Sequence, residues 1–403
     1  MRRSPRRTIE FLLYASGPAV AIVTTPFLAR GLGPDDRGVL GLVLAVSAIA
    51  TMLGNLGQAE VLVADGRSTR PSGASVRVGL TGGVVASAGA GIVLGVAGVD
   101  PVTTVIACLA IPFIVAIGLV HSLSIAARDT TRPAVGNWIA GAVRLVLIPL
   151  LAVTALLSLP SAVAILQFGF VLGFSVALLP YARSALRLVR DASTRSLGST
   201  IRAGSSVVAF GAITAITLRA DLFAVALVGD AVALGTYAAV VAVGQAGLAL
   251  SAHFKARVQA AARPGPGARR LVAAESVPLL GVCATAILGA ALLADPVAAA
   301  LFGPQFPGAA DLLRVVAVSA SALLILDVVH GLLTVLGLRR ELVLTASVGA
   351  IATMALLAVL VPLLGPVGAA TATAVAAATA SVVGGAIGLR ALGAYQKAEV
   401  VRA

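Results

Sequence analysis

The sequence predicts an all-α polytopic membrane protein with twelve transmembrane helices in two parallel six-helix repeats. Hydrophobic residues make up 59% of the 403-residue chain, and its mean hydropathy is +1.05. A soluble domain of this composition would lack enough polar residues to cover its surface. Twelve apolar runs also follow one another, each roughly the 20 residues that a helix needs to cross a bilayer. Finally, Lys and Arg gather in every second gap between these runs.

Each expected helix is an apolar run bounded by short segments of Gly, Pro or charged residues, which end helices. In the N-terminal half, the basic N-terminus precedes the first run and the Gly- and Asp-containing segment 31–38 follows it. The expected helices of this half are 9–29, 39–63, 78–99, 102–126, 134–157 and 161–188. Those of the C-terminal half are 205–228, 231–253, 271–293, 309–336, 342–364 and 367–389.

The distribution of basic residues predicts the orientation of the chain. If the N-terminus is cytoplasmic, 24 of the 29 Lys and Arg residues fall in cytoplasmic segments, and the outer segments keep Arg30, Arg37 and Arg314. Short cytoplasmic loops are enriched in Lys and Arg, so this split is a strong topology signal. We therefore expect a multi-pass protein of the cytoplasmic (plasma) membrane with both termini in the cytoplasm. The two remaining arginines, Arg144 and Arg219, fall inside expected helices.

The net charge of +13 is explained by this topology and does not indicate a nucleic-acid partner. Aromatic residues, which stack on bases, make up only 4% of the chain, and no nucleic-acid-binding motif is present. Basic cytoplasmic segments instead favour contact with anionic lipids of the inner leaflet. Cys108 and Cys283 lie within different expected helices and predict neither a disulfide nor a metal site.

The connections are too short to hold a catalytic domain. The outer ones carry scattered aspartates, and we find no paired carboxylates, no nucleophile beside a base and no phosphate-binding loop. We therefore expect no enzymatic activity, no catalytic residues, and no cofactor or metal. A polytopic enzyme of glycan assembly remains a second alternative, and a non-transporting scaffold for cell-wall assembly a further one.

The two halves of the chain, 1–200 and 201–403, resemble each other and predict two six-helix lobes. Because six crossings return the chain to the same side, both lobes share one orientation. Parallel repeats related by an axis along the membrane normal are typical of transporters. The matching landmarks are Gly38 and Gly235, His121 and His330, and Pro149 and Pro362.

Several segments resemble one family of bacterial exporters. They are LARGLGPDDRGVLGLV, TLRADLFAVALVGDAVALGTYAAV, ALFGPQFPGAADLLRVVAV and LVPLLGPVGAATATAV, in this order. Together they resemble the Wzx-type polysaccharide and O-antigen flippases of the multidrug/oligosaccharidyl-lipid/polysaccharide flippase superfamily. The resemblance implies two lobes around a V-shaped central cavity, in a bacterial cytoplasmic membrane. It also implies that an undecaprenyl-pyrophosphate-linked oligosaccharide moves from the inner to the outer leaflet by alternating access, with glycan assembly proteins as possible partners.

Charged residues within the expected helices are the candidate substrate-binding residues. Arg144 and Arg219 each lie about 15 Å from a helix end, near the bilayer centre. A charge at that depth is costly and therefore functional by default, and a guanidinium matches the oxygens of a pyrophosphate. Asp221 is the third candidate. Its side chain is rotated about 200° from that of Arg219, so it is expected to reach another helix rather than Arg219.

Asp327 and His330 are the candidate ion-coupling residues. They lie three residues apart in one expected helix and therefore share a face. An imidazole titrates near neutral pH, so this pair could carry a proton and couple export to a proton gradient. The alternative is a hydrogen-bonded pair that lines the cavity without cycling protons.

The main functional alternative is an ion-coupled multidrug or metabolite antiporter of the same fold. A cavity for cationic drugs would be rich in acidic and aromatic residues. Two arginines within the membrane and few aromatic residues favour an anionic substrate instead.

Overall fold

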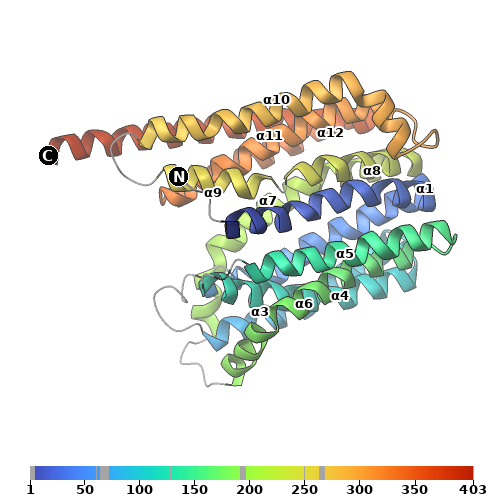
Figure 1. Ribbon diagram of the computed structural model, residues 1–403, viewed down its shortest axis with the longest axis horizontal. Coiled ribbons are helices and arrows are strands. Elements are labelled where there is room, and N and C mark those ends of the chain that lie inside the picture. Colours follow the sequence, from blue (N-terminus) through green and yellow to red (C-terminus); the bar gives the residue numbers. More distant parts are fainter. Residues whose placement is uncertain are drawn as a thin grey trace. The chain divides into compact units, whose positions relative to one another are not determined.

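A computed structural model describes residues 5–59, 61–63, 72–127, 129, 131–190, 197–248, 250–262 and 268–402. These ranges are almost entirely helical and contain no β-strand (Figure 1). The helices are α1 (Pro5–Asn55), α3 (Gly73–Val96), α4 (Pro101–Ala126), α5 (Thr131–Val153), α6 (Leu159–Arg190), α7 (Leu197–Val228), α8 (Ala231–Leu248), α9 (Ser251–Ala261), α10 (Ala268–Leu301), α11 (Ala309–Val335) and α12 (Arg339–Arg402).

Ten helices in the described ranges are long and apolar enough to cross a membrane. Two of them, α1 and α12, each contain two of the twelve expected runs. In α1 the break is at Gly33, whose φ of 75° and ψ of 174° interrupt the helix. Only glycine adopts a positive φ freely, so this residue makes the turn that the segment 31–38 predicted.

Helix α12 contains a second such break at Gly365, with φ 57° and ψ −136°. The halves on either side lie against each other, since Gly349 approaches Ala380 and Gly384 approaches Thr345. This pairing is that of an antiparallel helical hairpin. The predicted all-α polytopic fold is confirmed. Because α1 and α12 each contain two of the expected runs, ten helices correspond to twelve runs.

Two expected boundaries differ from the structure. The second run was expected to continue to residue 63, but α1 ends at Asn55 because Leu56 and Gly57 adopt positive φ. The eighth run was expected to reach residue 253, whereas α8 ends at Leu248 and a short helix, α9, follows. Much of the expected cytoplasmic connection 254–270 is therefore helical, and its side chains pack onto α10 and α11.

The chain divides into two compact units, Met1–Ala215 and Ile216–Ala403. The division falls within α7, whereas the sequence placed the lobe boundary at residues 200 and 201. In the first unit, α1 packs on α3 and α5, and α6 packs on α4 and α5. Small residues permit these close contacts. At the α5–α6 contact, a Cβ added to Gly173 would lie 2.5 Å from the carbonyl oxygen of Gly136.

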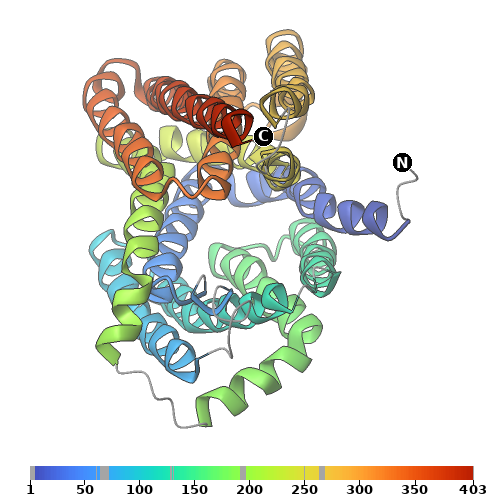
Figure 2. The same ribbon diagram turned by 90° about the vertical axis from the view of Figure 1, so that its left-hand side faces the viewer.

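In the second unit, α11 is the central helix and contacts α8, α9, α10 and α12. Figure 2 shows α10, α11 and α12 of this unit from one end. A buried cluster that includes Phe254, Val258, Cys283, Val328 and Leu332 joins α9, α10 and α11. In the most apolar 18-residue stretch of α10 only 17% of the residues are buried, the lowest share among the membrane-length helices of the described ranges. Most of the surface of this stretch is therefore available to lipid.

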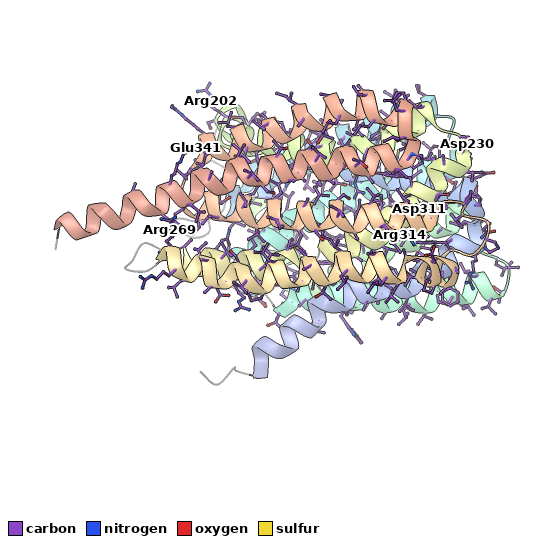
Figure 3. All side chains as sticks on the ribbon, turned by 90° about the horizontal axis from the view of Figure 1, so that it is seen from above. Arg202, Asp230, Arg269, Asp311, Arg314 and Glu341 are labelled. Atoms are coloured by element: carbon purple, nitrogen blue, oxygen red, sulfur yellow. The ribbon has the colours of Figure 1, made fainter. Side chains whose placement is uncertain are left out.

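The charged residues of the second unit that are labelled in Figure 3 lie toward two opposite ends. Arg269 and Glu341 lie toward one end, and Asp230, Asp311 and Arg314 toward the other. At the latter end, Arg314 forms ion pairs with Asp311 at 2.6 Å and with Asp295 at 2.5 Å. This separation agrees with the alternation that the sequence predicted, which placed Arg269 on the cytoplasmic side and Asp230, Asp311 and Arg314 on the outer side.

We expect reporter fusions at Gly33, Leu159 and Pro304 to be exposed on the outer side of the membrane. Fusions at Arg70, Arg195 and Pro264, which lie outside the described residues, are expected in the cytoplasm. The physical reason is the retention of Lys- and Arg-rich segments on the cytoplasmic side. Paired periplasmic and cytoplasmic reporters measure both sides, and one fusion on the wrong side would refute this topology.

Candidate functional site

Arg219 lies in α7 and points to α8 within the second unit. One of its terminal nitrogens donates a hydrogen bond to the side-chain oxygen of Gln245 at 2.9 Å. A guanidinium has five N–H groups, and among the described residues this is the only hydrogen bond that Arg219 makes. The arginine therefore keeps its charge opposite a neutral partner and retains donors for an anionic group.

Asp221 is buried and hydrogen-bonded to other groups of the same unit. It is 6% exposed and accepts hydrogen bonds from the hydroxyl of Tyr237 at 2.6 Å and from the backbone N–H of Leu222 at 2.7 Å. Tyr237 belongs to α8, so the prediction that Asp221 reaches another helix is confirmed. The described residues contain no ion pair between Asp221 and Arg219. Asp221 thus ties α7 to α8.

A cavity of about 220 Å³ connects these residues. Both Arg219 and Asp221 line it, together with Gln245 and with Ser319 of α11 and Thr373 of α12. The remaining lining residues are apolar, apart from the backbone at Gly244. The cavity is therefore a small polar site between four helices of membrane length. It contains the guanidinium of Arg219 and the carboxylate of Asp221, which already accepts two hydrogen bonds.

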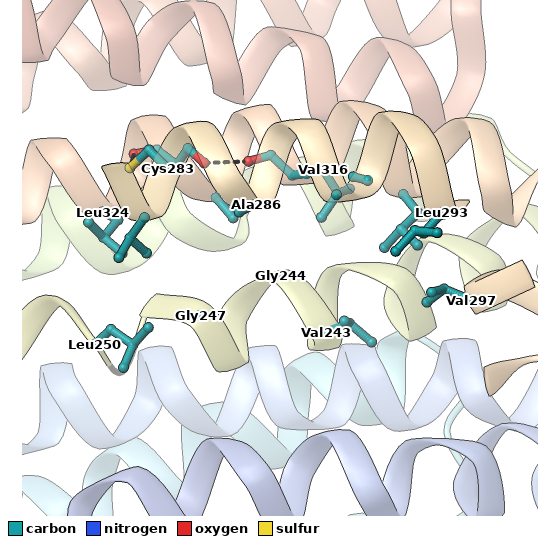
Figure 4. A pocket seen from close by; sticks show the side chains of 17 residues that line it. Val243, Gly244, Gly247, Leu250, Cys283, Ala286, Leu293, Val297, Val316 and Leu324 are labelled. Atoms are coloured by element: carbon teal, nitrogen blue, oxygen red, sulfur yellow. Dashed lines mark hydrogen bonds between the residues drawn. The ribbon is translucent and has the colours of Figure 1, made fainter. Parts of the chain in front are cut away.

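A larger apolar cavity of about 330 Å³ adjoins the polar one (Figure 4). Gly244, Val316 and Ala320 line both cavities, so the contact between α8 and α11 separates them. On α8, Gly244 and Gly247 carry no side chain and thereby leave room, and Cys283 of α10 lies across the space (Figure 4). Its lining suits a hydrocarbon group and offers no charged side chain.

Arg144 lies in the first unit, so it is not part of the Arg219 cavity. One of its terminal nitrogens donates to the carbonyl oxygen of Leu166 in α6 at 2.8 Å. Its Nε is buried and has no hydrogen-bond partner among the described residues. The next residue, Gln167, donates to the hydroxyl of Ser47 in α1 at 2.9 Å. Arg144 thus links α5 to α6, and Gln167 links α6 to α1.

Asp327 pairs with a residue that the sequence had assigned to a cytoplasmic loop. The Nζ of Lys255 in α9 lies 2.8 Å from the Oδ1 of Asp327 in α11, and both side chains are more than one-third exposed. Water screens such a pair, so its contribution to stability is small. His330, one turn further along α11, is buried. The hydrogen bond that Asp327 accepts comes from Lys255 of α9.

The approach of Lys255 to Asp327 depends on a glycine. A Cβ added to Gly331 would lie 2.5 Å from Cγ of Lys255, so the lysine stem crosses α11 where no side chain stands. Gln259, one turn along α9, donates to the carbonyl oxygen of Gly331 at 3.1 Å. Two side chains of α9 therefore bind one turn of α11. The water-accessible ammonium group of Lys255 thus lies beside Asp327, one of the two residues that the sequence proposed for ion coupling.

Three partners in these sites were not predicted from the sequence. Gln245 and Tyr237 are polar residues in an otherwise apolar run, a signal that could have identified them. Lys255 was counted as a topology charge because it follows the end of the eighth run. Its role became visible only when the helical path of α9 was known.

Comparison with solved structures identifies the fold. A multidrug resistance MATE family transporter of the MOP superfamily, in an inward-facing conformation, matches with a TM-score of 0.65 at 14% identity, covering 94% of this chain and 96% of that one. The lipid II flippase MurJ, in an inward closed conformation, matches with a TM-score of 0.68 at 10% identity, covering 99% and 91%. A MOP superfamily transporter from Pyrococcus furiosus, described as having a binding pocket of reverse polarity, matches with a TM-score of 0.62 at 14% identity, covering 96% and 95%.

No protein-family model and no curated protein matches the sequence. At these low identities the three structures establish the fold, which is that of MATE transporters and MurJ, both of the MOP superfamily. The all-α polytopic fold class is therefore confirmed, and the superfamily of this chain remains a prediction. The Wzx-type branch, the V-shaped cavity and the roles of Arg144, Arg219, Asp221, Asp327 and His330 remain predictions.

Proposed function

We propose that the protein is a flippase that moves an anionic, lipid-linked oligosaccharide from the inner to the outer leaflet of a bacterial cytoplasmic membrane. The observation that carries this proposal is Arg219. Its guanidinium lies within a helix of membrane length, lines a cavity, and has only a neutral hydrogen-bond partner. Burying a charge in this way is costly, so the site is expected to bind a group of opposite charge.

The chemistry of the site favours an anion over a cationic drug. The acidic residue in the cavity, Asp221, already accepts hydrogen bonds from Tyr237 and Leu222. Arg219 keeps free donors that fit the oxygens of a pyrophosphate. A cation would meet an unpaired guanidinium and would be repelled.

The adjoining apolar cavity supports a substrate with a hydrocarbon portion. It lies beside the polar cavity in the same unit and is lined almost entirely by aliphatic side chains and glycine backbone. A lipid carrier joined to a pyrophosphate has both chemical parts. The MurJ structure that shares the fold is a lipid II flippase, and the Pyrococcus transporter is described as having a pocket of reverse polarity, so the polarity of the binding pocket varies within this fold.

Translocation in proteoliposomes tests the proposal. Purified protein is reconstituted with an undecaprenyl-pyrophosphate-linked glycan, and its appearance in the opposite leaflet is measured by accessibility to a glycosidase. We expect movement that depends on the protein. Efflux of a cationic dye without glycolipid movement would instead identify the multidrug antiporter alternative, and it would refute the flippase.

The Asp327→Asn variant is expected to retain translocation but to lose its dependence on an imposed pH gradient. The substitution keeps the shape of the side chain and removes the negative charge that pairs with Lys255 and interacts electrostatically with His330. Translocation with and without the gradient is measured in the same proteoliposomes. Asp311→Asn, which removes the charge of an exposed pair on α11, is the matched control. Equal dependence on the pH gradient in wild type and Asp327→Asn would refute the proton-coupling role, and Asp327 and His330 would then only line the cavity.

A further inference from the structure

An open apolar groove of about 520 Å³ lies in the first unit. Residues from three helices line it: Leu53 of α1, a stretch of α3 from Arg77 to Ala86, and Ile201 near the start of α7. Every lining side chain is apolar except those of Arg77 and Thr81. The groove therefore combines a hydrocarbon-like surface with a single charged group.

Two glycines bring backbone into the lining of the groove. Gly54 of α1 and Gly82 of α3 both line it, and a Cβ added to Gly82 would lie 2.2 Å from the carbonyl oxygen of Gly54. This close approach removes side chains from the middle of the α1–α3 contact. The groove beside this contact therefore depends on Gly82, because any larger residue there would push α1 and α3 apart.

The charge lies at one end of the groove. Arg77 is in the second turn of α3, which begins at Gly73, and Val85 lies eight residues further along the same helix. At 1.5 Å per residue this separation is about 12 Å. Arg77 is exposed and forms no ion pair with any of the described residues. Arg77 is thus the first residue of α3 that lines the groove, and the apolar lining continues from it toward the middle of α3.

The surroundings of the groove are those of a lipid-covered surface. Val85 is 67% exposed, and the neighbouring Val84 and Leu53 are also exposed, although all three belong to helices of membrane length. The basic segments of the sequence place the start of α3 on the cytoplasmic side. The inner leaflet is rich in anionic lipids, which attract Lys and Arg near the membrane surface.

We propose that this groove binds an anionic phospholipid of the inner leaflet, with the phosphate at Arg77 and an acyl chain along Thr81 and Val85. Such a lipid contacts α1, α3 and α7 together. Because α7 also carries Arg219, the bound lipid stabilises the inner end of the helix that holds the candidate substrate site. The proposal concerns a membrane lipid and does not require the transported molecule to be a glycolipid.

Lipid titration of the detergent-solubilised full chain tests the site. Phosphatidylglycerol and phosphatidylcholine with identical acyl chains are added, and binding is followed by the rise in unfolding temperature. We expect wild-type protein to bind phosphatidylglycerol about fivefold more tightly, the ratio expected for one surface arginine. Glycerol 3-phosphate, which offers a phosphate without chains, should not raise the unfolding temperature at the same concentrations. Equal stabilisation by glycerol 3-phosphate would identify a free-phosphate site and overturn the lipid assignment.

Two matched pairs of variants separate the parts of the groove. Arg77→Gln should abolish the preference for phosphatidylglycerol, whereas Arg187→Gln, which removes an exposed cation of α6 in the same unit, should keep it. Val85→Trp fills the groove and should weaken binding of both lipids, whereas Val84→Trp at the adjacent exposed position should not. Arg77→Lys should retain a preference, which shows that position 77 tolerates substitution. An unchanged preference in Arg77→Gln, or an equal loss in Arg187→Gln, would overturn the proposal.

Discussion

Replacing Arg219 with alanine is expected to abolish translocation of the lipid-linked glycan while leaving the amount of protein in the membrane unchanged. Among the described residues the side chain makes a single hydrogen bond, to the neutral Gln245, and no ion pair, so its removal breaks no salt bridge. What is lost is the cationic partner of the substrate. Hydrogen bonds to charged groups contribute about 1.5–3 kcal/mol, so substrate binding should weaken by about 10- to 100-fold.

Arg219→Lys should recover only part of the activity, because lysine keeps the charge but lacks the planar fork that binds two phosphate oxygens. Arg314→Ala removes an arginine from an exposed cluster of the same unit and serves as the control. Translocation in proteoliposomes and quantified membrane abundance are the two measurements. Full translocation by a stably inserted Arg219→Ala protein would refute the role of this residue.

Arg144→Ala is expected to behave differently from Arg219→Ala. The guanidinium of Arg144 donates to the carbonyl oxygen of Leu166, so its loss removes a link between α5 and α6. A fall in both abundance and translocation would therefore indicate a structural role. The comparison of the two alanine variants separates substrate binding from helix packing.

Tyr237→Phe is expected to lower the stability of the second unit by about 1.5–3 kcal/mol, the cost of losing a hydrogen bond to a charged group. The Tyr237 hydroxyl lies 2.6 Å from the carboxylate of Asp221, and both residues are buried. Without the hydroxyl, the carboxylate keeps only the backbone N–H of Leu222. Thermal unfolding of the purified protein measures the loss.

Adding Asp221→Leu to Tyr237→Phe should restore part of this stability, because it removes the buried carboxylate together with its partner. Tyr181→Phe is the control. Its hydroxyl bonds to Asp129 at 3.0 Å near the end of α6, where water can replace the lost partner. If the double variant were as unstable as the sum of the single ones, the two groups would not be coupled.

The sequence by itself determined the fold class and most helix positions, because burial in lipid demands long apolar runs and retention of basic residues on one side. It also identified Arg144, Arg219, Asp221 and Asp327 as candidates, since a charged residue stands out in an apolar run. Even the exclusion of an Arg219–Asp221 pair followed from helical geometry alone. These features depend on composition and local spacing, which a single chain displays directly.

The tertiary structure alone decided which groups meet. The apolar runs predicted the break at Gly365 within α12, but they did not predict the short α9 that directs Lys255 to Asp327, because its path depends on contacts distant in sequence. In the same way, Gln245 became the partner of Arg219 and Tyr237 that of Asp221 only when α7 and α8 were packed. Helices of similar hydrophobicity can pack in many arrangements, and the close contacts of small residues select among them.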